Sequence, residues 1–255
     1  CIFIARNARP VTQMKVSVLV AANAEDFNQN VMKTEEVFEV SQFSSDTWVV
    51  SSPKEKELLE RLKKSYKSLE EFVNGEAYYG VKTGLSDAFL IDESVRNELI
   101  LSDSNSANLI KPMLRGRDIQ AWMPAWGDEY LIGTFPALQL DIDDYPAIKN
   151  HLLSFGISRL EQSGLKGSRK KTQNKWFETQ DTIAYYKEFA KPKIMYQAFQ
   201  VKPCFIYDTS GFFSNNSMWF IPTDSKALLA ILNSKMGWWL VTKFCTQIQN
   251  GYQLI

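Results

Sequence analysis

Two apolar runs flank a polar turn in the stretch Tyr79-Gly80-Val81-Lys82-Thr83-Gly84-Leu85-Ser86-Asp87-Ala88-Phe89-Leu90-Ile91. Aromatic and β-branched residues on both sides of a Gly/Ser/Asp cluster are typical of two strands joined by a turn. We therefore predict that residues 77–82 and 88–91 form a strand pair at the start of a sheet.

A helix is predicted immediately before this stretch, over residues 53–73. Ser52 is a good N-cap and Pro53 suits the first turn, while Asn74-Gly75 is a typical helix end. Apolar residues recur every three or four positions, at Leu58, Leu62, Tyr66, Leu69 and Val73. Lysines and glutamates mix on the opposite face, which is typical of a solvated face.

Strands and helices alternate irregularly over the rest of the chain. Strands are predicted at residues 14–20, 36–50, 130–135, 193–197, 204–208 and 218–221. Helices are predicted at 92–101, around 107–114, at 145–160 and at 226–241, the last capped by Asp224 or Ser225. Without regular βαβ alternation, this order predicts an α+β fold with a mixed or antiparallel sheet and peripheral helices.

Composition limits the class of protein. The 255 residues are 45% apolar, which suits one large domain or two small ones and excludes a disordered chain. Lys and Arg total 29, as do Asp and Glu, so the formal net charge is zero. Taken alone, a net charge of zero does not favour a nucleic-acid-binding domain.

Several kinds of site have no support in the sequence. Three dispersed cysteines and one histidine, His151, argue against a zinc site and fit reduced thiols, so we expect a cytoplasmic protein. No apolar run approaches the roughly 18 residues that a membrane span needs, and no nucleotide-binding glycine motif occurs. We predict no catalytic residue and no metal site here. Asp141, Asp143 and Asp144 leave open a cation-dependent hydrolase, although such a cluster is more typical of a helix start.

The zero net charge conceals an uneven distribution. Residues 25–46 hold six acidic residues and one basic residue, whereas residues 156–204 hold ten basic and four acidic residues, a net charge of +6. The densest part mixes cations, amides and an indole, which suits contacts to phosphates and base edges. The alternative is a solvated surface loop. The candidate DNA-binding residues there are Lys166, Arg169, Lys170, Lys171, Gln173, Asn174, Lys175 and Trp176.

A second basic cluster is Lys111-Pro112-Met113-Leu114-Arg115-Gly116-Arg117-Asp118. Arg115 and Arg117 flank a glycine, so they could approach a phosphate or a guanine closely. The alternative is that these arginines form internal salt bridges.

The sequence resembles a known family in an ordered set of motifs. These are the stretch 79–91, Ile110 to Ile119, Trp176-Phe177-Glu178, Lys191-Pro192-Lys193-Ile194 and Leu228-Leu229-Ala230-Ile231-Leu232-Asn233-Ser234-Lys235. Together they resemble the TaqI-like C-terminal specificity domain, a target-recognition module of restriction–modification enzymes that carry a DNA adenine methyltransferase. The resemblance covers roughly residues 77–240.

The resemblance implies a division of the chain and a partner. Residues 1–50 would be the last strands of an upstream methyltransferase domain, 51–76 a spacer helix and 77–255 the recognition domain. The partners implied are double-stranded DNA and that upstream domain, and the cofactor implied for the parent protein is S-adenosylmethionine, with none bound by this fragment. Lys82, Thr83, Arg115, Arg117 and the loop residues 166–176 would then face the duplex.

The sequence thus predicts a DNA-recognition module without catalytic activity of its own. It would position duplex DNA for adenine methylation by domains outside this chain, and whether those domains also cleave DNA stays open. The alternative is a protein-interaction scaffold that docks a partner subunit through the mixed-charge helix 53–73.

Overall fold

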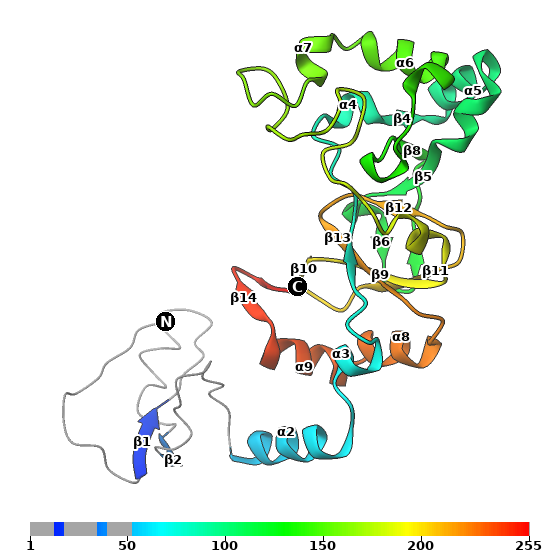
Figure 1. The fold of residues 1–255 in the computed structure, drawn as a ribbon. Helices are drawn as coiled ribbons and strands as arrows, with labels where there is room; N and C mark the ends of the chain where they lie inside the picture. The colour runs from blue at the N-terminus through cyan, green and yellow to red at the C-terminus, as the bar shows by residue number, and fades with distance from the viewer. Residues whose placement is uncertain (1–12, 18–34, 40–52, 255) are drawn as a thin grey trace. The chain divides into compact units, whose positions relative to one another are not determined.

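A computed structural model describes residues 13–17, 35–39 and 53–254 of the chain. The chain divides into two compact units, Cys1–Ser68 and Leu69–Ile255, which are described separately (Figure 1). The rest of the two strands predicted at 14–20 and 36–50 lies outside the described residues.

The first unit contains a strand pair and a helix. Strands β1 (Gln13–Ser17) and β2 (Glu35–Glu39) are antiparallel, with Met14 opposite Phe38. Helix α2 covers Pro53–Ser65.

The prediction of one helix over 53–73 is wrong beyond Ser65. A separate short helix, α3 (Leu69–Phe72), follows and ends at Asn74 and Gly75, whose φ angles are 52° and 72°. Tyr66 is 72% exposed and Leu69 43% exposed, so burial does not stabilise a continuous helix there. The mixed-charge helix on which the docking alternative depends is therefore two separate helices, α2 and α3.

Two four-stranded sheets form the centre of the second unit. One has the order β11–β9–β13–β3 and the other β12–β5–β8–β4. The strands of the first sheet are β3 (Tyr78–Tyr79), β9 (Lys193–Gln197), β11 (Phe205–Asp208) and β13 (Met218–Pro222). Those of the second are β4 (Leu90–Asp92), β5 (Ile110–Leu114), β8 (Glu129–Ile132) and β12 (Phe213–Ser214).

Smaller sheets and helices surround these two sheets. The strands are β6 (Ile119–Gln120), β7 (Met123–Pro124), β10 (Phe199–Gln200), β14 (Thr246–Ile248) and β15 (Gly251–Gln253). The α-helices are α4 (Ser86–Phe89), α5 (Glu93–Ser102), α6 (Pro146–Leu153), α7 (Ile157–Leu160), α8 (Lys226–Leu232) and α9 (Lys235–Phe244). Short 3₁₀ helices cover Ser104–Asn108, Gly116–Asp118, Pro136–Leu138, Ile142–Asp144 and Tyr186–Ala190. The α+β prediction is confirmed.

The strand pair predicted at 77–82 and 88–91 is wrong. β3 pairs with β13, β4 pairs with β8, and the two strands belong to different sheets. Between them the chain forms helix α4, in which Ala88 and Phe89 are fully buried. Burial of Phe89 in the core accounts for the helical turn, because the apolar residues here pack into the core and do not pair as a hairpin strand.

Most other predicted elements are confirmed, with three differences. The helix predicted around 107–114 is a 3₁₀ helix followed by β5, whose Ile110 pairs with Ile132. The helix predicted over 145–160 is interrupted at Gly156, where φ is 88°. The closing helix 226–241 is two helices, α8 and α9, and Ser225 caps the first by accepting the Leu228 N–H at 3.1 Å.

Asn233 explains the break between α8 and α9. Its side chain accepts the main-chain N–H of Phe205 at 3.0 Å and donates to the Phe205 carbonyl at 2.9 Å. These two hydrogen bonds are of the kind that a paired strand would form with the edge of β11. The helix break thus fixes the position of α8 and α9 relative to the first sheet.

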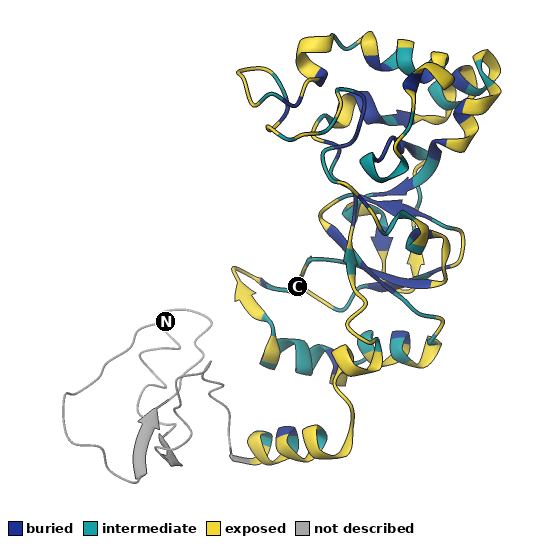
Figure 2. Cartoon of the chain, in the orientation of Figure 1, coloured by how far each residue is buried: buried dark blue, intermediate teal, exposed yellow. Residues whose placement is uncertain are grey.

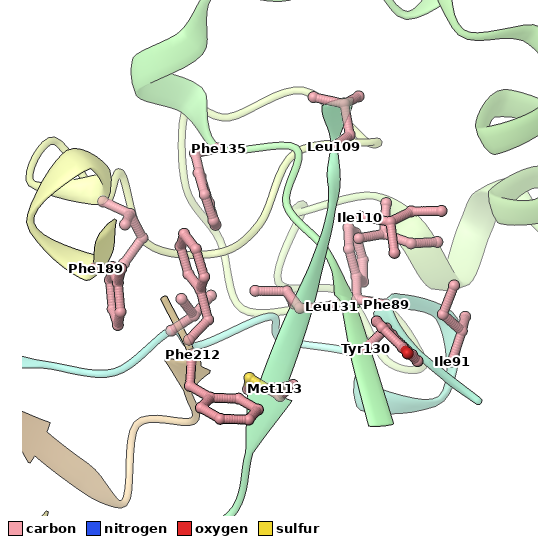
Figure 3. Packing of buried hydrophobic residues seen from close by; sticks show 14 of the residues in the cluster. Phe89, Ile91, Leu109, Ile110, Met113, Tyr130, Leu131, Phe135, Phe189 and Phe212 are labelled. Atoms are coloured by element: carbon pink, nitrogen blue, oxygen red, sulfur yellow. The ribbon is translucent and has the colours of Figure 1, made fainter. Parts of the chain in front are cut away.

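The main core lies around the second sheet. Figure 3 shows Phe135, Leu131 and Phe89 gathered around β5 and β8, and all three are at most 1% exposed. A smaller cluster, formed by Ile194, Tyr196, Phe205, Ile221, Leu229 and Leu254, packs between the first sheet and α8.

A buried ion pair joins β9 to β11 at one end of the first sheet. Lys193 Nζ, fully buried, donates to Asp208 Oδ2 and to the Phe189 carbonyl. Asp208 also accepts the main-chain N–H groups of Ser210 at 2.8 Å and Phe212 at 3.0 Å. Every partner of this carboxylate is a donor, so the buried charge is compensated.

Replacing one member of this pair tests its role. Lys193→Met leaves the Asp208 carboxylate buried without its cation, so we expect the free energy of unfolding to fall by about 3–5 kcal/mol in urea denaturation. The double variant Lys193→Met/Asp208→Asn removes the uncompensated charge and should recover part of that loss. A loss of less than about 1 kcal/mol for the single variant, typical of a surface pair, would contradict the assignment.

Candidate nucleic-acid interface

The stretch Gly80–Gly84 connects two groups of polar side chains. Its Val81 N–H donates to the Ser214 carbonyl at 2.6 Å, and its Lys82 carbonyl accepts the Gln180 N–H at 3.1 Å. A Cβ atom at Gly80 would lie 2.1 Å from the Asn215 carbonyl oxygen, so only glycine fits there. The stretch is therefore held against Asn215 at one end and the segment around Gln180 at the other.

Arg169 ties this stretch to the basic loop, defined here as residues 163–176. The side chain is 3% exposed, and its guanidinium lies over the Phe89 ring at 5.2 Å. It donates to four main-chain carbonyls, those of Leu160 (2.7 Å), Thr83 (2.9 Å), Glu178 (2.7 Å) and Trp176 (2.5 Å). Burial lowers the pKa of Arg169 to about 10, so the group stays charged at neutral pH.

Three predicted DNA-binding residues have internal roles in the structure. Arg169 and Thr83 are buried, and Asn174 Nδ2 donates to the carbonyls of Thr179 at 3.1 Å and Gln180 at 2.9 Å. The Arg169 guanidinium bonds to the Thr83 carbonyl, and Asn174 Nδ2 bonds to two carbonyls of the next segment, so these contacts hold the loop in place. Their role differs from the duplex contact that residue type alone predicts.

The predicted DNA-binding residues of the basic loop that are exposed are Lys166, Lys170, Lys171, Gln173 and Lys175, and Figure 2 shows much of this loop, after α7, in the colour of exposed residues. Lys82 and Lys170 both act on Asp181: burial raises the pKa of this carboxyl, and their charges partly oppose the rise. Cations from two separate segments thus act to lower the pKa of one carboxyl. Trp176 is half-buried, with its ring edge-on to Phe177.

A pocket of about 320 Å³ lies at the other end of the stretch. It is lined by Arg115, Gly116, Arg117, Gln197, Phe199, Asn215 and Ser217. Sequence reasoning proposed the two arginines but missed the other side chains. The available signals were Gln197 at the end of a predicted strand and the polar turn Asn215-Asn216-Ser217 before another.

The two arginines of the pocket differ in their contacts. The Arg115 guanidinium forms a bidentate salt bridge with Glu129, and the Arg115 main-chain N–H donates to Asp118 Oδ2 at 2.7 Å. Arg115 therefore fits the internal salt-bridge alternative. The Arg117 side chain is 73% exposed and lies 3.7 Å from Asp118 Oδ1, a long contact that leaves most donors open to solvent. Arg117 is therefore the arginine that a ligand can reach.

Not all of the basic residues in 156–204 contribute to a surface charge. Lys193 is buried with Asp208, Lys191 pairs with Glu188 at 2.7 Å, and Arg159 lies 3.9 Å from Asp87. Lys187 and Lys202 are also exposed, so the four exposed lysines of the basic loop are the densest, but not the sole, accessible positive charge of residues 156–204.

The aspartates at 141–144 have structural contacts. Asp141 Oδ1 accepts the Asp143 N–H at 3.0 Å, and Asp143 pairs with Lys149. Within the part of the chain that the structure describes, no group of three or more His, Cys, Asp and Glu side chains could hold a metal ion. In that same part, no helix combines the length and apolar character required to cross a membrane.

Residues 111–255 match the family model of the TaqI-like C-terminal specificity domain, which is more than half of the chain. The chain belongs to this family. The chain is also 22% identical over 248 residues to type II methyltransferase M.BstVI of Geobacillus stearothermophilus. That alignment covers 94% of this chain and 41% of the relative, so the chain spans less than half of the relative's length.

Among solved structures, the chain is similar to MmeI, a type IIL restriction-modification enzyme determined in complex with DNA. The TM-score is 0.46 at 13% sequence identity, over 71% of this chain and 23% of that one.

Arg169→Lys tests whether the guanidinium organises the basic loop. An ammonium cannot reproduce the planar fork of donors, so several buried carbonyls lose their partner and we expect destabilisation of about 2–3 kcal/mol. Urea denaturation measures this loss, and amide hydrogen exchange should become faster in residues 163–178. The neighbouring exposed variant Lys170→Gln should stay within about 0.5 kcal/mol of the parent chain. An Arg169→Lys variant as stable as the parent chain would contradict this role.

Proposed function

We propose that this specificity domain recognises a target sequence in double-stranded DNA. The observation that carries the proposal is the stretch Gly80–Gly84, which brings the pocket and the basic loop together. From Gly80 to Gly84 there are four residue-to-residue steps, which span at most about 14 Å, comparable with the roughly 12 Å width of the major groove. One duplex could therefore contact both groups of side chains.

The exposed lysines of the basic loop supply sequence-independent affinity. Lys166, Lys170 and Lys171 are exposed, and Lys82 approaches from the neighbouring stretch. Lysine acts as a mobile point charge that neutralises phosphates and releases counterions. Gln173, also exposed, and the half-buried Trp176 offer an amide and an indole to the same ligand.

We propose further that the parent protein is an adenine methyltransferase and that this domain positions DNA for it. The similarity to a type II methyltransferase supports this proposal. Residues 1–50 would end the catalytic domain, 51–76 would act as a spacer and 77–255 would recognise DNA.

S-adenosylmethionine would bind in the upstream domain. The pocket described above does not fit this cofactor, because two arginines line it and no carboxylate does, whereas the cofactor carries a sulfonium cation. No step of methyl transfer is therefore assigned to these residues.

Charge reversal in the basic loop tests DNA binding. For Lys170→Glu/Lys171→Glu we expect affinity for a duplex to fall by about tenfold or more, because two phosphate contacts become repulsive. The slope of log affinity against log salt should also decrease in magnitude by about 2. Fluorescence anisotropy with labelled duplex, repeated over a salt series, measures both quantities.

The matched control is Lys235→Glu at the start of α9, where the lysine is likewise exposed. Allowing for its smaller change in net charge, this variant should bind nearly as the parent chain does. Unchanged affinity of the double variant at low salt would overturn the assignment of the basic loop.

A further inference from the structure

We propose that the pocket reads the major-groove edge of one base pair, through Arg117, Gln197 and Asn215. This inference rests on the proposed function and assigns base discrimination to side chains outside the basic loop. The three residues come from three segments that are far apart in the sequence, and they line one pocket of about 320 Å³.

Gln197 presents an acceptor. Its Nε2 donates to the Gly116 carbonyl, which can only accept a hydrogen bond, so the orientation of the amide is fixed. This bond uses one of the two Nε2 hydrogens, so Oε1 and the second Nε2 hydrogen remain for a ligand. A side chain at Gly116 would crowd this amide, since a Cβ there would lie 3.2 Å from Nε2.

Asn215 presents donors. The Ser217 hydroxyl donates to Asn215 Oδ1 at 2.7 Å, which leaves the Nδ2 hydrogens for a ligand. The main chain at this position is fixed, because the Asn215 N–H donates to the Leu114 carbonyl at 3.3 Å and its carbonyl accepts the Met218 N–H at 3.0 Å. The amide is thus held in a defined place with respect to β5 and β13.

Arg117 adds a second set of donors. Its exposure contrasts with the engaged Arg115, two residues earlier, whose guanidinium is paired with Glu129. The pocket therefore combines the donors of Arg117 and Asn215 with Gln197, which offers an acceptor and one further donor.

This combination matches a base pair better than a phosphate. In the major groove each base pair presents two acceptors and one donor: N7, O6 and N4–H for G·C, and N7, O4 and N6–H for A·T. A phosphate presents acceptors alone and would leave Gln197 Oε1 without a donor. The order of the three groups along the pocket would decide which base pair is preferred.

Enrichment from a random duplex library tests the inference. The 255-residue chain should select a sequence motif. Asn215→Ala and Arg117→Ala should each reduce the preference for one base pair by about tenfold or more, and the position affected in the motif should be the same for both variants. Asn215→Asp, which replaces a donor with an acceptor, should change the base preferred there. Lys170→Gln is the matched control, because loss of a phosphate contact should weaken binding to all sequences equally and leave the motif intact.

A base analogue tests whether the pocket contacts the major groove. Replacing the purine at the affected position by its 7-deaza form removes N7 from the major groove, and this should weaken binding by the parent chain but not further weaken that by Asn215→Ala. Thermal unfolding of each variant confirms that it is folded.

The outcomes separate the two proposals. Failure of the parent chain to enrich any motif would overturn DNA target recognition itself. If the selected motif is the same for Asn215→Ala, Asn215→Asp and Arg117→Ala as for the parent chain, the pocket does not discriminate between bases, whether or not these variants bind more weakly. The proposed function would still stand. Full binding to the 7-deaza duplex by the parent chain would overturn the major-groove assignment.

Discussion

The buried guanidinium of Arg169 is the interaction on which the arrangement of the candidate interface depends. It satisfies carbonyls from the end of α7, from the stretch Gly80–Gly84 and from the segment 176–178, and it lies over the ring of Phe89 in the core. Arginine suits this place because its planar fork offers five donors in fixed directions. A loop without regular secondary structure is thereby fixed to the core. The lysines on its surface then point to solvent from a defined backbone.

The basic side chains of this protein fall into a buried group and an exposed group. The basic residues of 156–204 divide into those that stabilise the fold, such as Arg169 and Lys193, and those that are exposed, such as Lys170 and Lys171. The exposed group suits phosphates, while the pocket with Arg117 and two amides suits base edges. A net charge of zero is therefore compatible with binding to a polyanion, since the ligand meets one surface and not the average composition.

The sequence predicted much of the fold from local patterns. The strands at 193–197, 204–208 and 218–221 follow from short runs of apolar and β-branched residues, and these patterns are local. Sheet membership depends on distant partners, so the apparent hairpin at 77–91 belongs to two different sheets. The prediction of one continuous helix at 226–241 is likewise wrong, because the Asn233 side chain forms two hydrogen bonds with the main chain of Phe205 and the helix ends there.

The candidate site was predictable only in part. Residue type identified a basic loop but gave no indication of which cations point inward, because burial is set by tertiary contacts such as those of Arg169. Gln197 and Asn215 carry no charge and lie in separate segments, so only the folded chain brings them to Arg117.

Hydrogen exchange in the presence and absence of duplex DNA is the most direct test of the central claim, that one surface combines the pocket and the basic loop. Bound DNA should slow exchange together in residues 115–117, 166–175 and 215–217, and leave α8 and α9 unchanged. Slower exchange confined to α8 and α9, or to only one of the two groups, would contradict it.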